Sequence, residues 1–134
     1  MTTTTEQAKV SIPEKRHCRP LPSRDLAEIL EQHGDWLDSN GDVGIQADFS
    51  HEDLEGADLV DSRLQDALLN KAILKGADLM LADLREASLL QANLQDANLL
   101  GTMFQQANLQ AASISIGQNN REVLLKYRNA RMSR

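Results

Sequence analysis

The sequence has few aromatic residues, one cysteine and an excess of acidic over basic charge, and each shortage excludes a class of protein. Aromatic side chains make up 3% of the 134 residues, so an aromatic-rich core or a platform that stacks nucleic-acid bases lacks its material. The single cysteine, Cys18, excludes an intrachain disulfide and a cysteine-rich metal site. The 14 basic against 20 acidic residues, a net charge of −6, disfavour direct binding to nucleic acid or to an anionic membrane.

Long apolar runs are also lacking. None reaches the length of a transmembrane helix, and the first residues have neither the basic start nor the apolar stretch of a signal peptide. The length suits one small domain with its tails. We therefore expect a cytoplasmic protein that has no contact with a membrane.

What the chain does contain is an internal repeat of five residues. Over residues 47–116 a large apolar residue stands at every fifth position, fourteen times in succession. Ala stands two residues before it in all of these pentads except those with Glu52, Ser62 and Thr102. The fourteen apolar residues are Phe49, Leu54, Leu59, Leu64, Leu69, Leu74, Leu79, Leu84, Leu89, Leu94, Leu99, Phe104, Leu109 and Ile114.

A period of five excludes an amphipathic helix, because each step of five residues rotates the apolar side by about 140°. In extended backbone, residues two apart point the same way. Ala and the following Leu can therefore both face inward. The odd period then forces a bend at the two positions after each Leu, where Gly56, Gly76 and Gly101 occur.

The pattern Ala-Asp/Asn-Leu-x-x, as in ADLVD, ADLML, ADLRE, ANLQD and ANLLG, resembles the pentapeptide-repeat family. Members fold as a right-handed quadrilateral β-helix with four pentads per coil. The resemblance thus implies an all-β fold, a β-helix of about 3.5 coils over residues 47–116, with short capping helices at both ends. It covers about half of the chain.

The flanking segments look like covers for the ends of this solenoid. Ser23 can cap a helix over about 24–33 that Gly34 ends, with Leu26, Ile29, Leu30 and His33 on one face. The chain then divides into a disordered tail (1–22), a capping helix and turn (23–46), the β-helix (47–116) and a C-terminal helix (117–134). Glu52, at an inward position, fits an incompletely enclosed first coil, where its carboxylate meets water or a donor from the cap.

The C-terminal segment can form a second helix that carries Val123, Leu124, Tyr127 and Ala130 on one side. Its five basic residues stand against the single acidic residue Glu122, whereas the repeat is acidic. Opposite charges favour docking of this helix on the rod-shaped β-helix of the repeat. Whether this helix caps its own rod or that of a second copy stays open.

Groups that could perform catalysis or bind a metal are few. We expect His17, His33 and His51 to be surface or cap residues, since no Ser or Cys accompanies them in a known motif. The basic neighbours of Cys18 would favour its thiolate form, but its segment is expected to be unfolded. The sequence predicts no catalytic residue, no cofactor and no metal site.

One stretch imitates a calcium loop. Asp38-Ser39-Asn40-Gly41-Asp42 has the oxygen ligands that begin an EF-hand loop, but Val43 stands where glycine is required and Phe49 stands where the bidentate Glu belongs. We therefore expect a polar turn.

With twenty residues per coil, positions twenty apart stack into columns on the outside. Val60, Met80 and Leu100 form an apolar column with Leu81 at the same corner, and we call these four residues the apolar strip. Such a surface is expected to be covered. The chain's own C-terminal segment, a second copy in a homodimer, and an external protein partner all remain possible covers.

Two functions follow from these features. The first is a non-enzymatic structural or protein–protein interaction module with an unknown partner. The alternative comes from the resemblance, since some acidic family members mimic B-form DNA and bind DNA gyrase, a topoisomerase. The acidic columns Asp58 with Asp78 and Asp66 with Glu86 suit this alternative, but they are short.

Overall fold

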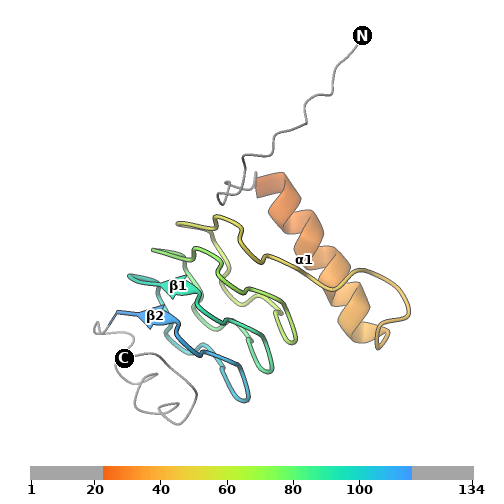
Figure 1. Cartoon of the computed structure of the whole chain (residues 1–134). Helices are drawn as coiled ribbons and strands as arrows, with labels where there is room; N and C mark the ends of the chain where they lie inside the picture. The colour runs from red at the N-terminus through yellow and green to blue at the C-terminus, as the bar shows by residue number, and fades with distance from the viewer. Residues whose placement is uncertain (1–22, 116–134) are drawn as a thin grey trace.

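The structure is a computed structural model that describes residues 23–115. One helix, α1 (Ser23–Asp38), precedes a series of short extended sides and turns. Within the described residues, the two stretches assigned as strands are β1 (Asn93–Leu94) and β2 (Ser113–Ile114), which pair in parallel. Figure 1 shows the sides following one another around a common axis, the coils stacked, and α1 beside the first coil. The predicted tail over 1–22 and the predicted helix over 117–134 lie outside the described residues.

Residues twenty positions apart pair in parallel on every side of the coil. Regular strands are short because each side holds little more than one paired residue before the chain turns again. The first rung of bridges, one per side, is Asp48 with Leu68, Asp53 with Ile73, Asp58 with Asp78, and Arg63 with Asp83. The four series then continue to the later coils. The predicted four pentads per coil are therefore confirmed.

Each corner is a tight turn that contains a left-handed residue. The second residue after every inward apolar residue, from His51 to Ala111, has a φ between 59° and 74°. The next N–H closes the turn, as when Ala77 donates to the carbonyl oxygen of Leu74 at 3.0 Å. A positive φ at the third position with this hydrogen bond is the geometry of a type II turn. The predicted bends are confirmed, and most corners hold a residue other than glycine despite a cost of about 1–2 kcal/mol each.

The interior consists of the inward residues of the pentads. The large apolar ones from Phe49 to Leu109 are all buried, with exposed fractions of 3% or less. Two of the three exceptions to Ala find partners for their hydroxyl groups. Ser62 Oγ donates to the carbonyl of Leu59 at 2.8 Å, and Thr102 Oγ1 donates to that of Leu79 at 2.7 Å.

Helix α1 is longer than predicted. It was expected to end at His33, but it continues through Gly34 to Asp38. A glycine ends a helix by adopting a left-handed conformation, and that conformation occurs at Asn40 and Gly41, with φ of 57° and 92°. The N–H of Gly41 then closes onto the carbonyl of Trp36 at 2.8 Å.

The helix packs on the first coil through its apolar face. Leu26, Ile29 and Leu30 contact the buried core of the coils, which agrees with the face predicted from the sequence. No helix within residues 23–115 combines the length and the apolar character needed to cross a membrane.

Candidate functional site

The apolar strip is continuous along one corner of the coils. The N–H of Asp61 donates to the carbonyl of Met80 at 2.8 Å, and the N–H of Leu81 donates to that of Leu100 at 2.9 Å. These bonds hold successive coils in register at the corner, so Val60, Met80 and Leu100 project from neighbouring rungs. Val60, Leu81 and Leu100 are 37%, 54% and 45% exposed. The predicted column therefore exists, while its role as an interaction surface stays a prediction.

Leu81 joins the strip by lying over the corner of the next coil. A Cβ atom placed on Gly101 would come within 2.7 Å of Leu81 Cδ2. The absence of a side chain at Gly101 thus leaves space for the Leu81 side chain over this corner. Neither Gly56 nor Gly76 has such a neighbour within 4 Å.

The first acidic column also has a structural role. Asp58 and Asp78 face each other across a bridge, as predicted. The Oδ1 atom of Asp58 accepts the N–H of Val60, and that of Asp78 accepts the N–H of Met80, both at 3.2 Å. Asp78 Oδ1 also accepts a hydrogen bond from the Asn98 amide at 3.1 Å. These carboxylates therefore fix the turns that present the apolar strip.

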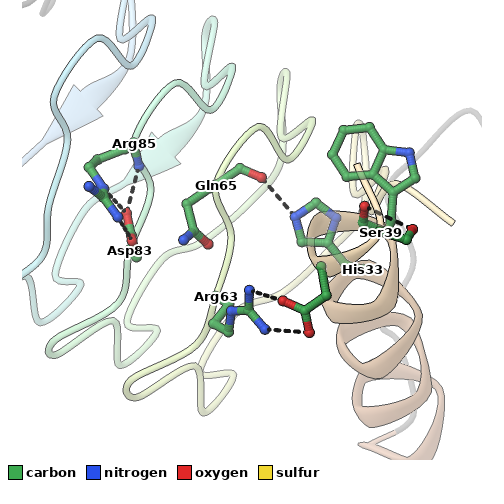
Figure 2. A network of polar contacts seen from close by, with 8 residues as sticks. His33, Ser39, Arg63, Gln65, Asp83 and Arg85 are labelled. Atoms are coloured by element: carbon green, nitrogen blue, oxygen red, sulfur yellow. Dashed lines mark hydrogen bonds and ion pairs between the residues drawn. The ribbon is translucent and has the colours of Figure 1, made fainter. Parts of the chain in front are cut away.

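The second acidic column has a basic neighbour. Asp66 and Glu86 line a shallow depression together with Arg85. The Arg85 side chain donates to both oxygens of Asp83, at 2.8 Å and 2.6 Å (Figure 2). Burial of Asp83 alone would raise the pKa of its carboxyl group, but the hydrogen bonds from Arg85 outweigh burial and lower it. This ion pair, which the sequence analysis did not identify, lies beside the column.

His33 connects α1 to the coils, although it was predicted only as a surface or cap residue. It is fully buried. Its Nδ1 accepts the N–H of Ala47 at 3.0 Å. Its Nε2 lies 2.8 Å from the carbonyl oxygen of Gln65 (Figure 2). The ring stacks on Trp36, with 5.5 Å between the ring centroids. Burial lowers the pKa of His33, against the opposing effect of the Gln65 carbonyl. The signal in the sequence was its place on the apolar face of the predicted helix.

The segment that imitates a calcium loop forms a turn, as predicted. Both oxygens of Asp38 accept hydrogen bonds from Arg63, at 2.8 Å and 3.4 Å (Figure 2). These hydrogen bonds lower the pKa of the Asp38 carboxyl group. Ser39 Oγ accepts the N–H of Val43 at 2.9 Å. The oxygens of this loop thus serve the junction of α1 and the coil.

Glu52 lies at an open part of the first coil, and one of its carboxylate oxygens is buried. It lines an open groove of about 450 Å³ between α1 and the first coil, with Asp25, Glu28 and Ile29 among the other lining residues. Its Oε1 atom is shielded from solvent and has no hydrogen-bond partner among the described residues. The open groove agrees with the incompletely enclosed first coil expected from the sequence, while the expected donor from the helix is not found for this oxygen among the described residues.

The described residues contain no group of three or more His, Cys, Asp or Glu side chains arranged to hold a metal ion. His51 is exposed at a corner, and His17 and Cys18 lie outside the described residues.

Comparisons with known proteins match the repeated part of the chain. The family model described as pentapeptide repeats matches residues 45–76 and 77–115, with eight copies. The matched stretches contain more than half of the 134 residues. No curated protein matches the chain.

Several solved structures are similar over the same region. The chain is 33% identical to a pentapeptide repeat protein of the cyanobacterium Cyanothece 51142, over 51% of this chain and 50% of that one, with a TM-score of 0.44. It is 29% identical to a pentapeptide repeat protein from the Arabidopsis thaliana thylakoid lumen, over 60% and 72%, with a TM-score of 0.41. It is 34% identical to HetL of Nostoc sp. strain PCC 7120, described as involved in heterocyst differentiation regulation, over 55% and 38%, with a TM-score of 0.36. The chain spans half the length of the Cyanothece protein.

Proposed function

The chain belongs to the pentapeptide-repeat family, and we propose that it is a non-enzymatic module for protein–protein interaction. The observation that carries this proposal is the apolar strip. A single exposed apolar side chain has no meaning for function, but the exposed Val60, Leu81 and Leu100 adjoin the half-buried Met80 across three rungs and form a patch with it. The family is in general a structural or interaction module.

The coil makes this patch a firm binding surface. Hydrogen bonds between coils fix the backbone beneath Met80 and Leu100, and the carboxylates of Asp58 and Asp78 fix the turns. Binding at a rigid surface costs less conformational entropy than binding at a surface whose loops must first become ordered. Met80 adds an adaptable side chain at the centre of the strip.

The proposed architecture is a right-handed β-helix of about 3.5 coils. We propose that α1 closes its first end, since Leu26, Ile29 and Leu30 pack on the core there. A solenoid needs such covers because its ends expose apolar side chains and unpaired backbone.

The alternative, an acidic mimic of DNA that binds gyrase, has less support. Asp58 and Asp78 use their oxygens to hold backbone N–H groups. The ion pair of Arg85 with Asp83 lies beside Asp66 and Glu86. Both features make the acidic columns less similar to a row of free phosphates.

The test is a pull-down from lysate of the source cell with three baits: the wild type, Met80→Glu and the control Leu90→Glu. Leu90 also points outward, but from a different column. The proposal expects a protein that the wild type and the control retain and that Met80→Glu loses, and that binds the purified wild-type chain again. Equal retention by all three baits, or no retained protein, would overturn the strip as a partner site. Light scattering of each bait separates a change of partner from a change of self-association.

A further inference from the structure

The proposed function leaves open what covers the apolar strip when no partner is bound. We propose that the chain's own segment 117–134 packs on the strip as an amphipathic helix and so regulates access to it. This inference rests on the strip being a binding surface. It assigns to the strip an occupant within the same chain, which a partner has to displace.

The position at which the described chain ends supports this occupant. The regular pairing runs to β2, and at Ser115 the ladder changes, because the N–H of Asp96 is bonded to Ser115 Oγ at 2.9 Å. The corresponding N–H group one side earlier, that of Gln91, donates to the backbone carbonyl of Gln110. Position 120 lies twenty residues after Leu100, so a chain that kept the register of the coils would reach the end of the strip five residues beyond Ser115. The nineteen residues after Ser115 are enough to reach it and to form a helix.

The size of the strip fits one helix better than a second copy. Three rungs at about 4.8 Å extend over roughly 10 Å, and two helical turns extend over about 11 Å. A stable dimer needs about 800 Å² on each partner, which is usually 20–30 residues. The strip provides four side chains.

The chemistry of the segment complements that of the strip. Val123, Leu124 and Tyr127 fall on one side of a helix. This apolar side suits the apolar strip and does not suit the polar columns. The segment 117–134 carries five basic residues and one acidic residue. The acidic residues that border the strip are Asp58, Asp61 and Asp78. Apolar contacts in the centre with opposite charges at the rim are the usual composition of a specific interface.

The experiment measures a contact between two side chains of the full-length protein by NMR. Tyr127 is the only tyrosine, so its ring protons are unambiguous, and the Met80 methyl signal is assigned by its loss in Met80→Leu. The proposal expects a nuclear Overhauser cross-peak between the Tyr127 ring and the Met80 methyl group. It also expects Leu124→Asp to abolish the cross-peak and the control Leu125→Asp, on the opposite side of the helix, to keep it.

A sample that mixes two differently labelled forms of the protein distinguishes a contact within one chain from a contact between two copies. Half of the chains carry the labelled methionine methyl groups with deuterated tyrosine, and the other half carry protonated tyrosine. A cross-peak in the mixed sample would mean that a second copy supplies the segment, which overturns the proposal. Absence of the cross-peak in the uniformly prepared wild type would overturn it as well. Trp36 fluorescence melts confirm that each variant remains folded.

The two proposals can fail separately. If the cross-peak is absent and Met80→Glu still loses a partner, the regulation is wrong and the interaction site stands. If the cross-peak is present and all baits retain the same proteins, the segment covers the strip but no partner uses it. If both proposals hold, Leu124→Asp increases retention of the partner relative to the wild type.

Discussion

The Nε2 atom of His33 lies 2.8 Å from the carbonyl oxygen of Gln65, a residue on another element 32 positions further along the chain. The other ring nitrogen accepts the N–H of Ala47. Both bonds form together only in the neutral ring with its proton on Nε2. A second proton on the ring would face the N–H of Ala47 and remove that bond.

The first prediction is a loss of stability in mild acid. Burial lowers the pKa of His33 in the folded protein, so the unfolded chain binds a proton at a higher pH than the folded one. The contribution of neutral His33 to the free energy of unfolding is complete above the ordinary histidine pKa of about 6.5. It decreases as the pH falls below that value toward the lowered pKa of the folded protein. Urea unfolding followed by Trp36 fluorescence should give a lower free energy of unfolding at about pH 5.5 than at about pH 8.

Two variants assign this effect. His33→Gln should be less stable than the wild type at both values of pH and should lose most of the difference between them. His51→Gln, at an exposed corner, should keep the difference. A pH dependence that is unchanged in His33→Gln would show that another group is responsible.

The second prediction concerns Glu52, which occupies a position where eleven of the fourteen pentads have Ala. Its Oε1 is buried without a partner among the described residues. Glu52→Ala should therefore raise the free energy of unfolding by about 1–3 kcal/mol. Thr102→Ala, at an equivalent position, should lower it, because the bond from Thr102 Oγ1 to Leu79 is lost. Chemical denaturation of both variants measures this, and a destabilised Glu52→Ala would contradict it.

The third prediction separates the charge of Asp58 from its hydrogen bond. Asp58→Ala should cost about 1 kcal/mol, because the N–H of Val60 loses its acceptor. Asp58→Asn should change little, since an amide oxygen can accept the same bond, as that of Asn98 does for Leu100. Thermal melts of the pair provide the measurement. If Asp58→Asn lowers the stability as much as Asp58→Ala does, the negative charge itself is needed, and the hydrogen bond alone does not explain the role of this column.

The fourth prediction concerns the inward leucines. Leu84 is completely buried, so Leu84→Asp should abolish folding and Leu84→Ala should cost about 2–5 kcal/mol. Leu81→Asp, at a side chain that is 54% exposed, should keep a cooperative melt by circular dichroism. A melt of Leu84→Asp close to that of the wild type would be incompatible with the coil.

The coil could be predicted in detail because one requirement, burial, repeats at a fixed spacing. Leu84 and Ala82 occupy the same relative positions as their counterparts in the other pentads, so the period alone indicated which side chains face inward. The bend had to follow each inward Leu. A positive φ at Leu81 or Glu86 was a consequence of that geometry and did not require glycine.

The junction with α1 was less predictable, because it depends on contacts between elements. Gly34 matched a local rule for helix ends, but the chain turns at Asn40 and Gly41. His33 was placed on the correct helix face, yet its acceptor on Gln65 is set by how α1 lies on the coil. The acceptor role of Asp58 was missed for a similar reason, since the spacing of the columns does not specify the side-chain torsion at a corner.

The pairing of residues twenty apart gives changes in chain length unequal consequences for the outer surface. Duplication of a whole coil would insert one more member into each column, so Val60, Met80 and Leu100 would still be aligned. Duplication of a single pentad between Met80 and Leu100 would preserve every inward Leu and every corner, yet it would turn all later residues by one side and move Leu100 away from Met80. The core tolerates insertions of any multiple of five residues, whereas the strip stays aligned only with insertions of a multiple of twenty.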